Sequence, residues 1–451
     1  MEKNLTEGSV LKSVVLFSLP YLLSYFLQML YGMADLFIIG QYGDVESITA
    51  VSNGSQVMYM FTAVIVGLAM GTTVVIGQAI GAKNHGHAAK SIGNTVTLFM
   101  MLSVVLTAIL LCFIHPIISV MSTPKEAING MIVYLTICFI GLPFITAYNI
   151  ISSIFRGMGD SKSPMYFIAV ACIVNIILDY IFIGSLHFGP AGAALGTTLS
   201  QAISVIASLV VILKRKDITV KKDDFKPNRL IMGEILRIGI PIAFQNGLIQ
   251  VAFIIITIIA NLRGLNDSAA VGIVEKVMSF LFLIPSSMLS TVSALGAQNI
   301  GAKKTKRAIK ILQYAVAITV IFGIIVSIVI QFTSEPIVAL FTDKTTRDGA
   351  DVIRLGGQYL RGYIWDCIFA GIHFSFSGYF CACGKSELSF LHNILAIVLV
   401  RVPGAYFMSI MFPMTLFPMG LATAAGSLFS VFICLIAFII IYRKNYISLE
   451  G

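Results

Sequence analysis

The chain has 451 residues, of which 57% are hydrophobic and only 11% are charged, whereas a typical soluble domain carries about 25% charged residues. Its apolar runs are too long and too frequent for a water-soluble core, so the composition predicts a membrane protein. The formal net charge of +9 does not indicate nucleic-acid binding, because the basic residues gather in short segments between apolar runs.

Apolar runs separated by charged or Gly/Pro-rich breaks predict twelve helices of about 20 to 30 residues, each long enough to cross a bilayer. The first six lie at residues 12–39, 47–76, 90–114, 127–153, 163–184 and 190–213. The other six lie at residues 233–262, 268–297, 307–332, 352–379, 387–411 and 418–442. The predicted fold class is an all-α polytopic membrane protein, with twelve transmembrane helices in two pseudo-symmetric six-helix lobes.

Basic residues in alternate connections set the predicted orientation, because cytoplasmic loops are enriched in lysine and arginine. These connections contain Lys83 and Lys90, Arg156 and Lys162, Lys214 to Arg237, Lys303 to Lys310, Lys385, and Arg443 with Lys444. We therefore expect a multi-pass protein of the plasma membrane with both termini in the cytoplasm. Residues 214–232 are predicted to be a cytoplasmic linker between an N-terminal lobe, 1–213, and a C-terminal lobe, 233–451.

The two halves of the chain end one of their apolar runs with the same motif. Gly77-Gln78-Ala79-Ile80-Gly81-Ala82-Lys83 in the first half is echoed by Gln298-Asn299-Ile300-Gly301-Ala302-Lys303 in the second. Because each half has six predicted helices, both halves begin on the same side of the membrane and the repeat is parallel. A ligand pathway between two lobes is therefore expected.

Ionisable residues inside the predicted helices are the sharpest functional signal, because a charge at the centre of a bilayer is costly and is usually functional. Asp35 lies in the first helix and Asp179 in the fifth, with Asn175 one turn earlier on the same face. Thr197 in the sixth helix adds a hydroxyl. These four residues predict a cation or proton site. Oxygen ligands suit Na⁺ and a carboxylate pair suits a proton, and the sequence does not separate the two.

The second half offers further candidates. Glu275, Asp366 and Arg401 are ionisable residues within apolar runs, and Trp365, the single tryptophan of the chain, precedes Asp366. An aromatic ring beside a carboxylate suits a flat cation, while tryptophan also anchors helices at the membrane interface. Arg401 is expected to neutralise a carboxylate in the same lobe as a tethered cation. Pro20, which shares a helix with Asp35, is a candidate hinge.

An enzymatic function is not favoured. Gly157-Met158-Gly159-Asp160 matches the Gly-x-Gly-Asp pattern of intramembrane aspartyl proteases, but it lies between Arg156 and Lys162 in a predicted cytoplasmic turn. Catalysis of that kind would need a second carboxylate in mid-membrane. The sequence also lacks a Gly-x-x-x-x-Gly-Lys-Ser/Thr loop, so ATP is not expected as the direct energy source. No cofactor is expected.

Several motifs together resemble the multidrug and toxic compound extrusion (MATE) family over nearly the whole chain. They are Pro20 with Ala34-Asp35 and Gly40, Gly77-Gln78-x-x-Gly81-Ala82, Phe155-Arg156-Gly157-Met158-Gly159-Asp160, Asn175-Ile176-Ile177-Leu178-Asp179, Gly189-Pro190-Ala191-Gly192-Ala193-Ala194, and Gln298-Asn299-x-Gly301-Ala302. The resemblance implies twelve helices in two lobes and export of drugs in exchange for Na⁺ or H⁺. It is closest to the subgroup similar to DNA-damage-inducible proteins (DinF-like).

The resemblance also implies site residues. The N-terminal cation site of that subgroup falls on Asp35, Asn175, Asp179 and Thr197, and all four residue types are retained. A C-terminal site of another subgroup includes a tenth-helix aspartate, which Asp366 matches. It also includes a seventh-helix glutamate, which this chain lacks. Gln245 and Asn246 occupy that stretch, so coupling through the second lobe stays open.

The expected function is that of a secondary active antiporter, which exports lipophilic, often cationic, organic compounds in exchange for H⁺ or Na⁺ by alternating access. Its expected partners are small organic substrates and membrane lipids, and the protein is expected to be a monomer. A lipid or glycolipid flippase is the alternative within transporters, and it would need a strongly cationic cavity for phosphate head groups. A channel or receptor is the alternative of another class.

Overall fold

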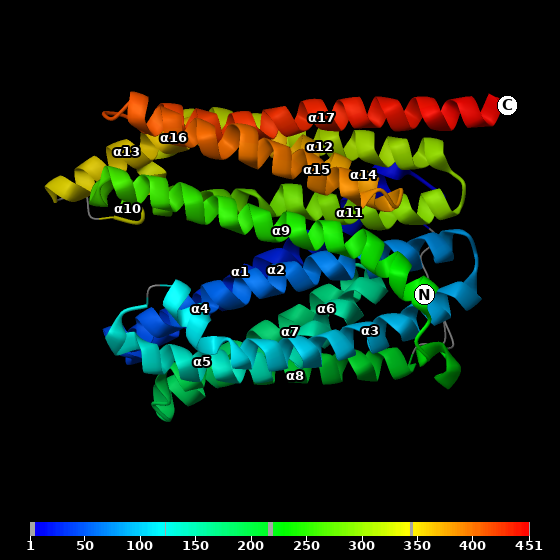
Figure 1. The fold of residues 1–451 in the computed structure, drawn as a ribbon, viewed down its shortest axis with the longest axis horizontal. Helices are drawn as coiled ribbons and strands as arrows, with labels where there is room; N and C mark the ends of the chain where they lie inside the picture. Colours follow the sequence, from blue (N-terminus) through cyan, green and yellow to red (C-terminus); the bar gives the residue numbers. More distant parts are fainter. Residues whose placement is uncertain (1–4, 122, 215–219, 343–345, 451) are drawn as a thin grey trace. The chain divides into compact units, whose positions relative to one another are not determined.

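The computed structural model describes residues 5–121, 123–214, 220–342 and 346–450, and these residues form helices joined by short connections (Figure 1). In the first half the α-helices are α1 (Val10–Tyr42), α2 (Val45–Gly81), α3 (His85–Cys112), α4 (Ile114–Val120), α5 (Ile128–Ile140), α6 (Leu142–Gly157), α7 (Lys162–Asp179) and α8 (Gly189–Lys214). In the second half they are α9 (Arg229–Arg263), α10 (Leu265–Leu281), α11 (Leu283–Gly301), α12 (Thr305–Val338), α13 (Arg347–Tyr363), α14 (Asp366–Ala382), α15 (Ser386–Ala396), α16 (Val402–Met411) and α17 (Phe417–Glu450).

The predicted all-α membrane fold is confirmed. Within the described ranges, ten helices or joined helices are long and apolar enough to cross a membrane, and a bent pair brings the number to eleven. The remaining predicted span, 352–379, is occupied by α13 and α14, each of 17 residues. Ile364 and Trp365 separate these two helices, so neither is long enough alone to reach the length of a membrane span.

Three of the predicted spans depart from a regular α-helix at identifiable local features. The fourth span bends by 47° between α5 and α6, where Gly141 precedes a proline in the first turn of α6. Proline has no backbone N–H and therefore starts a helix more readily than it continues one. The fifth and eleventh spans each contain a π-helical segment, η2 (Tyr180–Ser185) directly after Asp179 and η4 (Ile397–Arg401) ending at Arg401. Such segments are often found at functional sites.

The chain forms two compact units. The first unit comprises residues 1–7, 16–243 and 297–303, and the second comprises residues 8–15, 244–296 and 304–451. The predicted division into lobes 1–213 and 233–451 with a linker at 214–232 stays a prediction, and residues 215–219 of that linker lie outside the described ranges.

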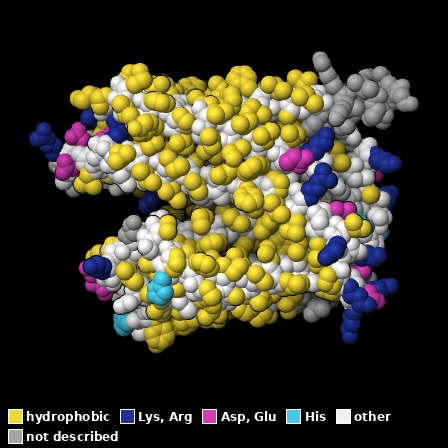
Figure 2. All heavy atoms as spheres, viewed as in Figure 1, with side chains coloured by type: hydrophobic (Ala, Val, Ile, Leu, Met, Phe, Trp, Pro, Cys, Tyr) yellow, Lys and Arg dark blue, Asp and Glu magenta, His cyan; other side chains and the backbone are white. Residues whose placement is uncertain are grey.

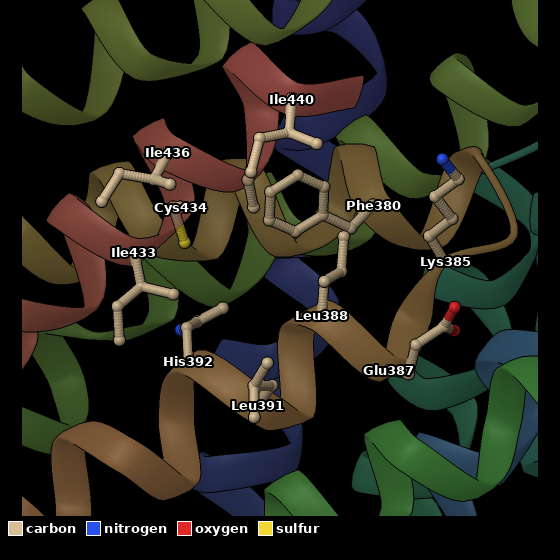
Figure 3. Close-up of a pocket in the computed structure, with 11 residues that line it drawn as sticks. Phe380, Lys385, Glu387, Leu388, Leu391, His392, Ile433, Cys434, Ile436 and Ile440 are labelled. Atoms are coloured by element: carbon tan, nitrogen blue, oxygen red, sulfur yellow. The ribbon is translucent and has the colours of Figure 1, made fainter. Parts of the chain in front are cut away.

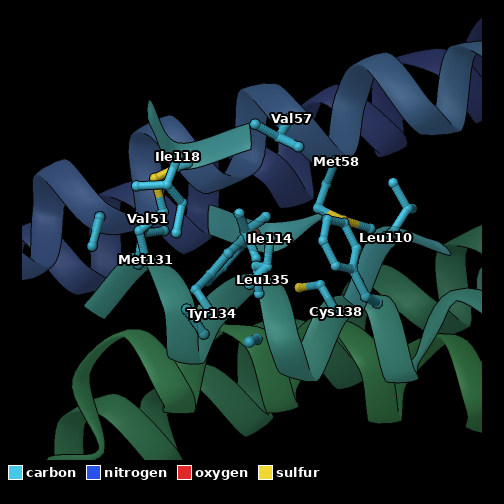
Figure 4. Packing of buried hydrophobic residues seen from close by; sticks show 14 of the residues in the cluster. Val51, Val57, Met58, Leu110, Ile114, Ile118, Met131, Tyr134, Leu135 and Cys138 are labelled. Atoms are coloured by element: carbon cyan, nitrogen blue, oxygen red, sulfur yellow. The ribbon is translucent and has the colours of Figure 1, made fainter. Parts of the chain in front are cut away.

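Each unit has its own apolar core. In the first unit, side chains from α2, α3, α4 and α5 interdigitate, with Val57 and Met58 of α2 packed near Leu110, Ile114 and Leu135 (Figure 4). In the second unit, the core joins residues of α9, α10, α12, α13, α14, α16 and α17. Large apolar side chains such as Phe37, Ile206, Phe332 and Ile436 are exposed. On the face shown in Figure 2 they cover the lengths of the helices, while lysine and arginine gather near the helix ends. This is the surface expected of a protein dissolved in lipid.

The echoed motifs have the same backbone conformation. Lys83 and Lys303 follow α2 and α11 with φ of 57° and 58°, a left-handed conformation that residues other than glycine seldom adopt. Both lysine N–H groups donate to an isoleucine carbonyl three residues earlier, Ile80 and Ile300. The two copies of the motif therefore fold into the same turn.

The two motifs also pack against each other inside the first unit, to which residues 297–303 belong. A Cβ atom added to Gly81 would lie 1.9 Å from the carbonyl oxygen of Gln298, and one added to Gly301 would lie 2.0 Å from that of Gln78. Real Cβ atoms do not approach oxygen so closely. Glycine at both positions is therefore required by the close approach of the two helix ends.

The described part of the predicted linker is hydrogen-bonded to α3. The Asn94 amide donates to the Asp224 carbonyl at 3.1 Å and accepts from the Asn228 N–H at 2.7 Å, and the Thr97 hydroxyl donates to the Phe225 carbonyl at 2.7 Å. Residues 220–228 are thus held along one helix of the first unit.

Asn94→Ala is expected to release this segment. It removes two hydrogen bonds worth about 1 kcal/mol each, so local opening should increase by roughly tenfold or more. Limited trypsin digestion at Lys221, Lys222 and Lys226 measures the opening, and cleavage should be about tenfold faster than in the unmodified protein. Asn266→Ala removes an exposed amide elsewhere and serves as the control. Equal cleavage rates in the two variants would contradict the role given to Asn94.

Candidate functional site

Three helices of the first unit bring together the four residues of the predicted cation site. Asp35 comes from α1, Asn175 and Asp179 from α7, and Thr197 from α8, and their exposed fractions are 3%, 1%, 0% and 9%. The Thr197 hydroxyl donates to Asp35 Oδ2 at 3.0 Å. Asp179 and Asn175 both lie close enough to Asp35 to interact with its carboxylate. Residues as far as about 160 positions apart in the sequence therefore form one buried polar cluster. We call Asp35, Asn175, Asp179 and Thr197 the acidic cluster.

Most of the polar atoms in this cluster are incompletely satisfied by the described residues. Among the described residues, Asp35 Oδ1, both carboxylate oxygens of Asp179, and both polar atoms of the Asn175 amide make no hydrogen bond of good geometry. Buried polar atoms are nearly always hydrogen-bonded, and an exception needs an explanation. Two adjacent buried carboxylates also repel each other when both are ionised. The cluster therefore has the character of a site that takes up a positive charge.

The donor set fits either of two ligands. Two carboxylates, one amide oxygen and one hydroxyl are hard oxygen ligands of the kind that Na⁺ takes, and a carboxylate pair also shares a proton readily. Asp35 and Asp179 would supply the negative charge to such an ion, while Asn175 and Thr197 would complete its oxygen shell. The geometry brings the predicted residues together without distinguishing Na⁺ from H⁺.

Gly196 is a residue of this site that the sequence did not single out. A Cβ atom at Gly196 would lie 2.0 Å from Asp179 Oδ1 and 3.5 Å from the Asn175 amide nitrogen, so the absence of a side chain makes room for the carboxylate. The only indication in the sequence that Gly196 belongs to the site is its position directly before Thr197. Tyr134 is a second such residue, because its hydroxyl lies 3.1 Å from that of Ser55 and it borders Asp35.

Gly196→Ala is expected to disturb the site without weakening the helix. Alanine is a better helix former than glycine by about 1 kcal/mol, but its methyl group must displace the Asp179 carboxylate. We expect the cation concentration that gives half-maximal export to rise at least about tenfold, which corresponds to about 1.4 kcal/mol. Gly272→Ala, where nothing lies within 4 Å of the added Cβ, is the matched control. A normal cation dependence in Gly196→Ala would contradict this role for the space beside Asp179.

The second unit holds another buried charged cluster, formed by three of the predicted candidates. Arg401 Nη2 lies 3.8 Å from Asp366 Oδ2 and donates to the Tyr363 hydroxyl at 2.6 Å. The guanidinium also stands over the ring of Phe253, 5.2 Å from its centroid. Glu275 accepts from the Thr257 hydroxyl at 3.3 Å. Arg401 therefore pairs with Asp366, a carboxylate of the same lobe.

The remaining candidate residues lie in the second unit and, for Pro20, in the first. Gln245 is fully buried, and its amide atoms are without a partner among the described residues, whereas Asn246 has an interaction. Trp365 is 38% exposed at the break before α14, and its role as an anchor or as a ligand contact stays a prediction. Pro20 lies inside α1, a continuous helix, and the Ser24 hydroxyl donates to the Pro20 carbonyl at 2.8 Å. Its role as a hinge stays a prediction.

A surface pocket of about 410 Å³ lies between α14, α15 and α17 of the second unit. Figure 3 shows Lys385 and Glu387 at one end of it and apolar side chains, including Leu391, Ile433 and Ile436, along the rest. None of the predicted site residues lines this pocket. It is a crevice on an apolar surface, separate from both charged clusters.

The sequence of this chain is similar to a known protein family over most of its length. A family model described as MatE matches residues 20–181 and 241–407. The matched residues include Asp35, Asn175 and Asp179 but not Thr197. The chain is 29% identical over 413 residues to the probable multidrug resistance protein YoeA of Bacillus subtilis (strain 168), covering 90% of this chain and 88% of the relative. It is 26% identical over 382 residues to the multidrug export protein MepA of Staphylococcus haemolyticus (strain JCSC1435), covering 84% and 83% of the two chains.

Solved structures show the same fold. A transporter of the MOP superfamily from Pyrococcus furiosus superposes with a TM-score of 0.90 at 23% identity, covering 99% of this chain and 98% of that chain. At this level of identity the likeness concerns the arrangement of helices.

Proposed function

The chain belongs to the MATE family of multidrug transporters, and we propose that it is an antiporter that exports organic compounds in exchange for an inward-moving cation. The observation that carries the proposal is the acidic cluster of the first unit. It combines two buried carboxylates with unpartnered oxygen atoms and therefore suits a monovalent cation or a proton. The relatives named above as multidrug proteins support organic substrates.

The cluster would couple the two movements through its charge. With the cation bound, one of the two negative charges is offset, the repulsion between Asp35 and Asp179 is relieved, and α1, α7 and α8 can pack closely around them. Without it, the carboxylates repel each other and favour a conformation in which water or a cationic substrate reaches them. A ligand shifts a conformational equilibrium only by its difference in affinity for the two states. Cation and organic substrate would therefore favour different states of the transporter, and exchange follows.

The basic residues in alternate connections support a cytoplasmic location for both termini. In the second unit, Arg401 already neutralises Asp366 at 3.8 Å. We therefore assign coupling to the first unit, where the described residues place no guanidinium or ammonium group beside the carboxylates.

Transport by the purified protein in liposomes tests the proposal. A Na⁺ gradient and a pH gradient are imposed separately, and the movement of a cationic dye such as ethidium is followed by fluorescence. Exchange driven by one of the two gradients supports antiport and identifies the ion. Dye movement that is independent of both gradients, or an ionic current without dye movement, would overturn it.

A further inference from the structure

A second polar cluster lies in the first unit, where rows of polar side chains on α1 and α6 meet. Both rows follow a helical spacing, so that each row lies on one face of its helix. The residues are Tyr21, Tyr25 and Gln28 on α1, and Tyr148, Ser152 and Arg156 on α6. The Arg156 guanidinium lies over the Tyr21 ring, 4.3 Å from its centroid, and Tyr148 lies beside both Gln28 and Ser152.

Arg156 is a buried charge without a counter-ion. The residue is 9% exposed, and the ionisable groups near its guanidinium in the described chain are the phenols of Tyr21, Tyr25 and Tyr148, with no carboxylate among them. Phenols are neutral at pH 7. The ring of Tyr21 offsets only part of the cost of removing a guanidinium from water.

Two buried hydroxyl groups near Arg156 are weakly satisfied among the described residues, because that of Tyr148 lies within reach only of Ser152 and Gln28. Within the described residues, the Tyr148 hydroxyl and the Ser152 hydroxyl are buried and make no hydrogen bond of good geometry. Each can donate one hydrogen bond, and the guanidinium has five N–H donors. The cluster therefore has an excess of positive charge and of hydrogen-bond donors. An oxyanion would supply the matching negative charge and acceptors.

A purely structural role leaves this surplus unexplained. Arg156 lies in the last turn of α6, where a cation interacts favourably with the helix dipole. However, the Met158 N–H already donates to the carbonyls of Ile154 and Arg156 at this helix end. A helix-capping role would also not require the hydroxyls of Tyr148 and Ser152 to be buried nearby.

We propose that Arg156, Tyr148 and Ser152 bind a carboxylate or phosphate group of a transported molecule. This inference rests on the proposed export function and extends its substrates from organic cations to molecules that also carry an anionic group. Tyr21 and Gln28, which border the proposed subsite, are about 21 Å and about 11 Å from Asp35 along α1, from the rise per residue of a helix. The anion subsite and the acidic cluster are therefore two separate places of opposite charge in the same unit.

Binding to the purified full-length protein tests the proposal without requiring transport. The probes are a rhodamine with a free carboxylate and the ethyl ester of the same dye, which differ only in the anionic group. Fluorescence polarisation gives their dissociation constants. We expect the protein to bind the acid about tenfold more tightly than the ester. Arg156→Gln should reduce this ratio to about one, while Arg156→Lys should retain part of it.

Arg229→Gln, which removes an exposed arginine at the start of α9, should leave the ratio unchanged. Equal binding of acid and ester by the unmodified protein, or an equal loss for both dyes in Arg156→Gln, would overturn the proposal. Competition with inorganic phosphate or with phosphatidylglycerol in nanodiscs shows whether a free anion or a lipid head group reaches the same site. Because binding is measured without a gradient, a preserved preference for the acid together with absent cation-driven export would contradict only the proposed function.

Discussion

Asp35→Asn and Asp179→Asn are each expected to reduce gradient-driven export to the level of protein-free liposomes. Each change removes one of the two buried negative charges that would bind the cation, and the amide has nearly the same volume as the carboxylate. The protein should therefore remain folded, and relief of the repulsion between two buried carboxylates should leave it at least as stable as the unmodified chain. Initial rates of dye export under the effective gradient measure the loss.

The matched control is Asp351→Asn, which removes a carboxylate that is 45% exposed and pairs with Arg354 on the surface of α13. Such exposed pairs contribute little, so export by this variant should be normal. Size-exclusion chromatography verifies that all three variants are monodisperse. If Asp35→Asn or Asp179→Asn exports the dye at the normal rate under the same gradient, the acidic cluster is not the coupling site.

Gly81→Ala and Gly301→Ala are expected to be the most destabilising glycine substitutions among those in helices. The new methyl group would lie 1.9 Å from the Gln298 carbonyl oxygen in the first variant and 2.0 Å from that of Gln78 in the second. Backbone must move in either case, and overpacking of this kind typically costs about 1–3 kcal/mol. The midpoint of thermal unfolding in detergent should fall by several degrees, and export should fall with it.

Gly32→Ala is the control for these variants, because nothing lies within 4 Å of its added Cβ and alanine favours the helix. The double variant is a sharper test. Once one methyl group has separated the two helix ends, the second should cost little, so the combined loss should be smaller than the sum of the single losses. Additive losses, or single variants as stable as Gly32→Ala, would contradict the contact.

Most of the fold can be predicted from the sequence, because one physical requirement determines the structure of a membrane-spanning segment. A run of about 20 apolar residues must satisfy its backbone hydrogen bonds internally, and this makes helix the outcome. The grouping of Asp35 with Asp179 was also predictable, since carboxylates are costly in an apolar helix and are therefore conspicuous. The i, i+4 spacing of Asn175 and Asp179 placed both residues on one face.

Other features depend on contacts between distant segments and leave no local signal. The tenth span breaks at Ile364 and Trp365 without a proline or glycine between α13 and α14. Gly196 matters only because the Asp179 carboxylate from another helix occupies the space beside it. Its position beside Lys162 predicts that Arg156 belongs to a cytoplasmic loop, yet Arg156 is 9% exposed and lies over Tyr21. In each case the partner comes from elsewhere in the chain.

The reciprocal packing of the two echoed turns is the pattern expected if the chain arose by duplication of a shorter gene. Gly81 approaches Gln298, and Gly301 approaches Gln78, so residue i of one copy meets residue j of the other and the reverse also holds. This is the relation between identical subunits across a twofold axis. A six-helix ancestor that assembled as a homodimer would have made this contact twice with one sequence. Such an origin would leave each copy constrained by the other, because a side chain at either glycine would push the two helix ends apart.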